Sequence, residues 1–84
     1  MNETDPVVKI RRYKVNGQDC ILASVAAEIL GVHRKTITRR QGRRGPYARF
    51  VDPETGRVMV PLHDLKADLS PGMWQYIERE AEDA

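Results

Sequence analysis

Arginine and lysine side chains are concentrated in the middle of the chain. Seven of them fall between residues 34 and 49, and no acidic residue falls in that stretch. Guanidinium and ammonium groups donate hydrogen bonds to phosphate oxygens and to the edges of guanine, so such a block favours a polyanion as the partner. On charge alone, a solvated basic surface without a ligand is the alternative.

The charges are also unevenly divided along the 84 residues, although the net charge is only +2. Residues 7–50 hold eleven Lys or Arg and two acidic residues, whereas residues 63–84 hold two Lys or Arg and six acidic residues. A basic front followed by an acidic tail predicts one face for a polyanion. The tail would suit the basic face of a neighbouring copy.

Residues with other chemistry are few. Cys20 is the only cysteine, so the chain has neither an intramolecular disulfide nor a cysteine zinc cluster. His33 and His63 have no ligand partner at a metal-binding spacing, and no nucleophile is paired with a base. We therefore expect no enzymatic activity, no metal and no cofactor.

The composition points to a small protein of a reducing compartment. No apolar run is long enough to cross a bilayer, and residues 1–6 carry two acids in place of a basic leader. We expect a cytoplasmic protein, nucleoid-associated when bound, with no membrane partner. Residues 1–6 are expected to form a flexible N-terminus.

A short hairpin is predicted near the start. Residues 8–15 partly alternate and run into Asn16-Gly17, a strong turn signal. A two-residue turn would set Val15 opposite Gln18 and Tyr13 opposite Cys20, with an extended arm as the alternative. The basic side chains of this segment either extend the contact with a ligand or are solvated without a ligand. They are Lys9, Arg11, Arg12 and Lys14.

Two helices with a glycine between them follow. Apolar residues at 22, 25, 26, 29 and 30 predict a helix that ends at Gly31, and His33 is placed to cap a second helix from Arg34 to about Gln41. This is the helix-turn-helix pattern. Its expected core consists of Ala26, Ala27, Leu30, Gly31, Val32 and Ile37.

The second helix carries the candidate reading residues. With Ile37 turned inward, the solvent face of the second helix would project into a major groove of DNA. The candidates are Arg34, Lys35, Thr38, Arg39 and Arg40.

The rest of the chain predicts a hairpin and further helices. Two β-prone pieces flank the loop 52–56, and Pro61 can open a short helix with Leu62, Leu65 and Leu69 on one face. Ser70 is placed to cap a last helix. Its apolar stripe fits a core better than a partner surface: Met73, Trp74, Ile77 and Ala81.

Three segments resemble one known family. AAEILGVHRKTITRR (residues 26–40) resembles the helix-turn-helix of the MerR-like winged-helix group, which includes phage excisionases. VPLHDLKADL (60–69) is similar to the segment after the wing, and VNGQDCILAS (15–24) to the lead-in. The resemblance implies a small α+β fold, mainly α, namely a winged helix-turn-helix. It would comprise an N-terminal hairpin, two helix-turn-helix helices, a β-hairpin wing and one or two C-terminal helices.

The resemblance also divides the chain and assigns residues. The DNA-binding domain would span residues 7–69, and residues 70–84 would pack on it or mediate self-association. The wing, residues 49–60, would bring Arg49 and Arg57 to the minor groove or the phosphates. The connector before the wing would bring Arg43 and Arg44 to phosphates.

One departure from the family concerns the end of the second helix. The family usually has apolar residues where this chain has Arg40 and Gln41. Either the helix is shorter there, or its tail lifts off the core toward DNA. Arg40 therefore ranks below Arg39 as a base reader.

Among related functions, an excisionase fits the size and layout best. Such a protein would bind repeated double-stranded sites, bend the DNA and direct a phage integrase toward excision, through self-association as cooperative copies or a dimer. The alternatives are a small transcriptional repressor or activator, a DNA-packaging adaptor, and a protein-interaction module that uses the acidic tail.

Overall fold

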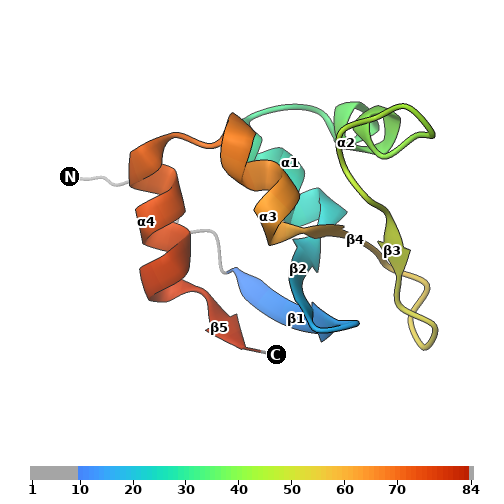
Figure 1. Cartoon of the computed structure of the whole chain (residues 1–84), viewed down its shortest axis with the longest axis horizontal. Coiled ribbons are helices and arrows are strands. Elements are labelled where there is room, and N and C mark those ends of the chain that lie inside the picture. Colours follow the sequence, from blue (N-terminus) through green and yellow to red (C-terminus); the bar gives the residue numbers. More distant parts are fainter. Residues whose placement is uncertain (1–9, 84) are drawn as a thin grey trace.

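Two hairpins that are far apart in the sequence share one sheet (Figure 1). The computed structural model of the chain describes residues 10–83. In it, β1 (Arg11–Val15) and β2 (Gln18–Leu22) form the first hairpin, and β3 (Phe50–Val51) and β4 (Val58–Pro61) form the second. β4 pairs antiparallel with β2, which sets Leu22 opposite Met59. The two hairpins are thereby fixed relative to each other.

The first hairpin has the predicted register. Tyr13 lies opposite Cys20, and Val15 lies opposite Gln18. Asn16 and Gly17 both have positive φ angles, of 51° and 80°. This is the backbone of a two-residue turn whose twist matches that of the paired strands. The hairpin is therefore confirmed, and the extended arm is excluded for residues 11–22.

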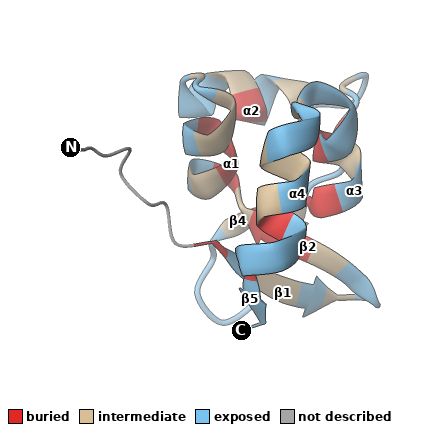
Figure 2. Ribbon diagram, turned by 90° about the vertical axis from the view of Figure 1, so that its left-hand side faces the viewer, coloured by how far each residue is buried: buried red, intermediate tan, exposed pale blue. Residues whose placement is uncertain are grey.

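Within residues 10–83 the chain forms four α-helices and a five-stranded sheet of order β3-β4-β2-β1-β5. The helices are α1 (Ala23–Leu30), α2 (Arg34–Arg40), α3 (Leu62–Leu65) and α4 (Pro71–Glu80), and a 3-10 turn covers Lys66–Asp68. Figure 2 shows buried residues where the helices face one another and the sheet. The molecule is thus a small α+β fold. None of its helices in the described part is long and apolar enough to cross a membrane.

A tight turn joins α1 to α2. Gly31 adopts the left-handed conformation, with φ of 67°, and its N–H bonds to the carbonyls of Ala27 and Glu28. The Nδ1 atom of His33 then accepts a hydrogen bond of 3.1 Å from the Lys35 amide, which caps α2. Both ends of the turn follow the sequence prediction, because glycine tolerates positive φ and a histidine ring can accept from a first-turn amide.

The core lies between the helices and the sheet. Ile21, Ile37 and Val60 are fully buried there, and Ala26 and Ala27 let α1 approach its neighbours closely. α4 adds the fully buried Ile77 to this core, and Met73 and Trp74, which are partly buried, pack against the core, so the interpretation of this stripe as core is confirmed. Cys20 is also fully buried, and burial raises the pKa of its thiol.

The end of the described chain forms a strand that the sequence pattern did not predict. β5 (Glu82–Asp83) pairs parallel with β1, so that Arg12 lies opposite Asp83. The Arg12 guanidinium donates to the carbonyl of Ala81 at 3.0 Å and lies 3.3 Å from the Asp83 carboxylate. Two acidic residues carry no strand periodicity, so this pairing had no local signal. The expectations for residues 1–6 and Lys9 concern residues outside those described.

The turn after α2 depends on a glycine. The amide of Tyr47 donates to the Arg40 carbonyl at 2.9 Å, and this closes the backbone over Gly45. A Cβ atom on Gly45 would lie 1.8 Å from that same carbonyl oxygen. The backbone must therefore move if any side chain is introduced at residue 45.

We expect Gly45→Ala to lower the free energy of unfolding by about 1–3 kcal/mol, because the new methyl group overlaps the Arg40 backbone. Gly72→Ala is the matched control: it lies in the first turn of α4, where a Cβ atom would have nothing within 4 Å. Urea unfolding followed by circular dichroism measures both. Equal stability of the two variants would contradict the packing described for Gly45.

Candidate nucleic-acid interface

α2 presents a basic face to solvent. Ile37 is fully buried, and the side opposite to it carries Lys35, Thr38 and Arg39, all exposed. Arg34, at the start of the helix, is exposed as well. None of the ion pairs among residues 10–83 involves Arg34, Lys35 or Arg39. Their charged ends therefore remain available to an anionic ligand.

Arg40 is placed differently, although the sequence grouped it with the reading residues. Its guanidinium donates to the Tyr47 hydroxyl at 3.1 Å and lies 3.8 Å from the Asp68 carboxylate. The charge also sits over the Tyr47 ring, 5.8 Å from its centroid. Arg40 follows Ile37 by three positions and so points toward the body of the molecule. Its guanidinium therefore contacts residues of this chain, whereas Lys35 and Arg39 are exposed and have no ion-pair partner among the described residues.

Gln41 decides between the two expectations for the end of this helix. α2 ends at Arg40, and the Gln41 side chain is buried, with 7% of its surface exposed. Its amide nitrogen donates to the carbonyl of Ala48 and to that of Met59, both at 3.1 Å. The helix is therefore shortened, and its tail is fastened to the β3–β4 hairpin instead of lifting away.

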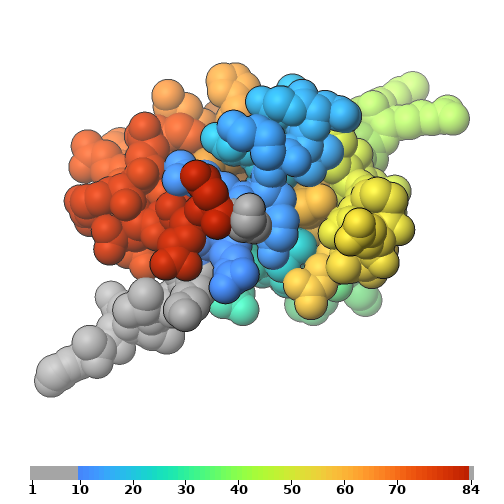
Figure 3. Space-filling model, turned by 90° about the horizontal axis from the view of Figure 1, so that it is seen from below, coloured from blue at the N-terminus to red at the C-terminus, as the bar shows by residue number. Residues whose placement is uncertain are grey.

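The connector after α2 carries two more exposed cations, Arg43 and Arg44. Figure 3 shows this segment, in lime green, projecting beyond the rest of the surface. Arg44 and Arg39 line a common shallow hollow of about 430 Å³. The connector thus extends the basic face of α2 at one end.

The loop of the second hairpin is held by its own side chains. The Asp52 carboxylate accepts from the Glu54 amide at 2.9 Å and from the Thr55 hydroxyl at 3.0 Å. These hydrogen bonds lower the pKa of Asp52. The Thr55 hydroxyl oxygen in turn accepts from the Arg57 amide at 3.2 Å, and Gly56 takes a φ of 72°. The loop therefore fixes the backbone from which Arg57 projects.

Arg57 joins the hairpin to the basic face of α2. It lines one hollow of about 300 Å³ together with Arg34, over Leu22, Ser24 and Val58. Arg49 is exposed immediately before β3 and borders neither this hollow nor that of Arg44. The structure thus brings Arg34 together with Arg57, and Arg39 together with Arg44. Arg40 borders the same hollow as Arg39 and Arg44, but its guanidinium is bound to Tyr47 and lies near Asp68.

Carboxylates lie behind this face and support it. The Tyr47 hydroxyl donates to Asp68, and Asp64 accepts from the Ala48 amide at 2.8 Å. The tail acids lie farther away, because α4 and β5 occupy the end of the molecule opposite α2 and the β3–β4 hairpin (Figure 1). Sequence reasoning missed the supporting roles of Gln41, Tyr47, Asp64 and Asp68, because each depends on a contact with a distant or non-periodic residue.

Comparisons with known proteins leave this face without an assignment. No protein-family model, curated protein or solved structure matches the chain significantly. In the part of the chain that the structure describes, no three His, Cys, Asp or Glu residues lie together in a way that could hold a metal ion. The arrangement can offer guanidinium and ammonium donors over an extended surface.

We expect Gln41→Leu to lower the free energy of unfolding by about 1–3 kcal/mol, because the Met59 carbonyl would lose its buried donor. Gln75→Leu, the same change at an exposed position of α4, is the control and should fall within about 0.5 kcal/mol of the wild type. Urea unfolding gives both values. If the two variants are equally stable, the Gln41 amide does not hold the hairpin.

The cluster formed by Arg40, Tyr47 and Asp68 predicts a loss of stability at high pH. Burial, aided by the bond to Asp68, raises the pKa of Tyr47 above its ordinary value of about 10. The folded state therefore holds the phenol proton more tightly than the unfolded state does. The resulting contribution to the free energy of unfolding is fully present below about pH 10 and is lost as the pH rises through the folded-state pKa. Urea unfolding at several pH values should show this fall in the wild type and in Tyr76→Phe. The same fall in Tyr47→Phe would show that another group causes it.

Proposed function

We propose that the chain is a sequence-specific double-stranded DNA-binding protein with a winged helix-turn-helix. In this proposal α1 and α2 are the helix-turn-helix, and the β3–β4 hairpin is the wing. The observation that carries it is the set of exposed cations on α2, none of which pairs with a described residue, continued by Arg57 of the hairpin across a shared hollow. The resemblance of residues 26–40 and 60–69 to the MerR-like group supports the same assignment.

The contacts divide by chemistry. Lys35 and Arg39 would reach guanine edges in the major groove, whose width of about 12 Å admits a helix, and the Thr38 methyl group would meet a thymine methyl. Arg43 and Arg44 would bind phosphates, which gives affinity without sequence choice. Arg34, which the sequence places among the reading residues, borders the hollow of Arg57 and is therefore assigned to a phosphate as well. Arg57 and Arg49 would reach the minor groove or the adjacent backbone. Arg40 is left out of the reading set, since its guanidinium is bound to Tyr47 and Asp68.

Among DNA-binding proteins, we favour an excisionase that directs a phage integrase. One unit of this size buries too little surface for high specificity, so several copies on adjacent sites or a dimer are expected. α4 and β5, which carry four acidic residues, lie at the end of the molecule opposite α2 (Figure 1), and this arrangement suits copies that follow one another on DNA. Bound in this way, the copies would bend the duplex at deformable steps.

Selection from a random duplex library at two salt concentrations, followed by footprinting of the enriched sequences, tests this proposal. Tandem direct repeats protected cooperatively support the excisionase. An inverted pair of sites points to a dimeric transcriptional regulator of the same fold. If no sequence is enriched and binding does not depend on salt, the protein is not a DNA-binding protein.

We expect Arg39→Ala and Lys35→Ala each to weaken binding to the selected duplex by about 1–3 kcal/mol and to relax the sequence preference. Arg79→Ala removes the same charge from the exposed side of α4 and serves as the control. Fluorescence anisotropy titrations measure all three.

The double variant Arg43→Ala/Arg44→Ala tests the connector separately. If both side chains bind phosphates, the variant binds every sequence more weakly by the same factor. The slope of log K against log salt then falls by about 1 for each phosphate that the variant no longer neutralises. A change in sequence preference with an unaltered slope would assign these two residues to bases instead.

A further inference from the structure

A third hollow lies beside the proposed interface, between the first hairpin and α1. Its volume is about 270 Å³, and its lining residues are Arg11, Tyr13, Leu22, Val25 and Arg57. No carboxylate lines it, and the first turn of α1, which borders it, has no acidic residue. The proposed function assigns no ligand to this hollow, and neither Arg11 nor Tyr13 has a role in it.

The alternation along β1 separates its cations into two groups. Arg12 and Lys14 point to one side, where Arg12 pairs with Asp83 and Lys14 lies 3.1 Å from Asp19. Arg11 points to the other side with Tyr13, into the hollow, and no ion pair among residues 10–83 involves it. Of the cations of β1, Arg11 is thus the one whose charge is not compensated by a described residue.

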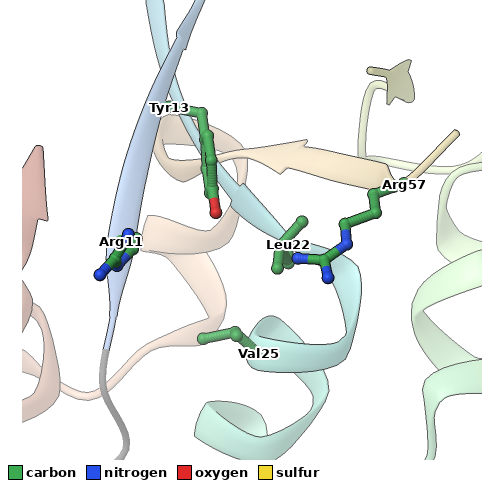
Figure 4. Close-up of a pocket in the computed structure, with 5 residues that line it drawn as sticks. All are labelled: Arg11, Tyr13, Leu22, Val25 and Arg57. Carbon is green, nitrogen blue, oxygen red and sulfur yellow. The ribbon is translucent and has the colours of Figure 1, made fainter. Parts of the chain in front are cut away.

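The side chains around the hollow form a set of donors over an apolar floor. Figure 4 shows the Tyr13 hydroxyl directed into the space between β1 and α1, with Leu22 and Val25 beneath it. Arg57 enters from the side of β4, across from Arg11. Two guanidinium groups and a phenol hydroxyl suit a phosphate oxygen, and the two aliphatic side chains suit the carbon atoms of a sugar.

We propose that this hollow binds one sugar–phosphate unit of the DNA backbone, with Arg11, Tyr13 and Arg57 as donors to the phosphodiester. This inference rests on the proposed function and extends it: it makes the N-terminal hairpin part of the DNA interface.

The position of Arg57 links the hollow to the rest of the interface. Arg57 lines this hollow with Arg11 and the adjoining one with Arg34 of α2. A strand of the duplex that leaves the groove occupied by α2 therefore meets Arg34, then Arg57, then Arg11. The footprint on that side extends beyond the contacts of α2 and the wing.

Equilibrium binding to the selected duplex tests the hollow, with Arg11→Gln compared against Lys14→Gln. The two substitutions remove one positive charge from the same strand, on opposite sides. We expect Arg11→Gln to weaken binding about tenfold and to lower the salt slope by about 1, and Lys14→Gln to change neither measurably. Tyr13→Phe should weaken binding less than Arg11→Gln and leave the slope unchanged, because it removes a hydroxyl group and no charge.

Neutral methylphosphonate linkages, placed one at a time along the duplex, locate the contact. At one linkage the wild type should bind more weakly, while the affinity of Arg11→Gln falls no further. The hollow is not a phosphate site if Arg11→Gln and Lys14→Gln bind the unmodified duplex with equal affinity. The same conclusion follows if each methylphosphonate lowers the affinity of Arg11→Gln as much as it lowers that of the wild type.

Thermal unfolding of each variant verifies that the fold is retained. Retention of binding by Arg11→Gln while Arg39→Ala loses it would overturn the assignment of the hollow and leave the proposed function in place. Retention by both variants would overturn the proposed function and this inference together.

Discussion

The amide of Gln41 is buried between the end of α2 and the β3–β4 hairpin, where it donates to carbonyl groups of two separate segments. A buried carbonyl without a donor costs free energy, so this side chain favours one relative position of the helix and the hairpin. The Arg40–Tyr47–Asp68 cluster holds the intervening loop, and Gly45 lets that loop pass close to the Arg40 backbone. These contacts fix the position of α2 relative to the hairpin, and with it the relative positions of their basic side chains.

The basic residues of the described chain differ in whether a carboxylate lies near them. Arg12, Lys14 and Arg40 each lie within ion-pair distance of a carboxylate, whereas Arg34, Lys35 and Arg39 have no such partner among the described residues. Composition counts all of these residues alike, but a guanidinium bound to Tyr47 and Asp68 would have to break those contacts before it reached DNA. Fewer basic side chains therefore lack an ion-pair partner than the count of basic residues indicates.

Local signals account for what could be predicted from the sequence. The Asn16-Gly17 turn, the Gly31 and His33 caps and the buried Ile37 each follow from one residue type and its near neighbours, and the structure confirms them. The pairing of β2 with β4 and of β1 with β5 joins segments far apart in the chain, and no pattern marks it. The same holds for Gln41: a polar residue after a basic helix gave two alternatives, and only the packing of the hairpin over it decides between them.

We have proposed that the face formed by α2 and the β3–β4 hairpin binds duplex DNA. Nuclear magnetic resonance of the 15N-labelled chain, titrated with a duplex selected from a random library, tests it residue by residue. With a duplex that carries a single site, the amide resonances of residues 34–44 and 52–57 should shift with added duplex, while those of α4 and β5 stay in place. Shifts confined to α4 and β5, or no shifts at all, would contradict it.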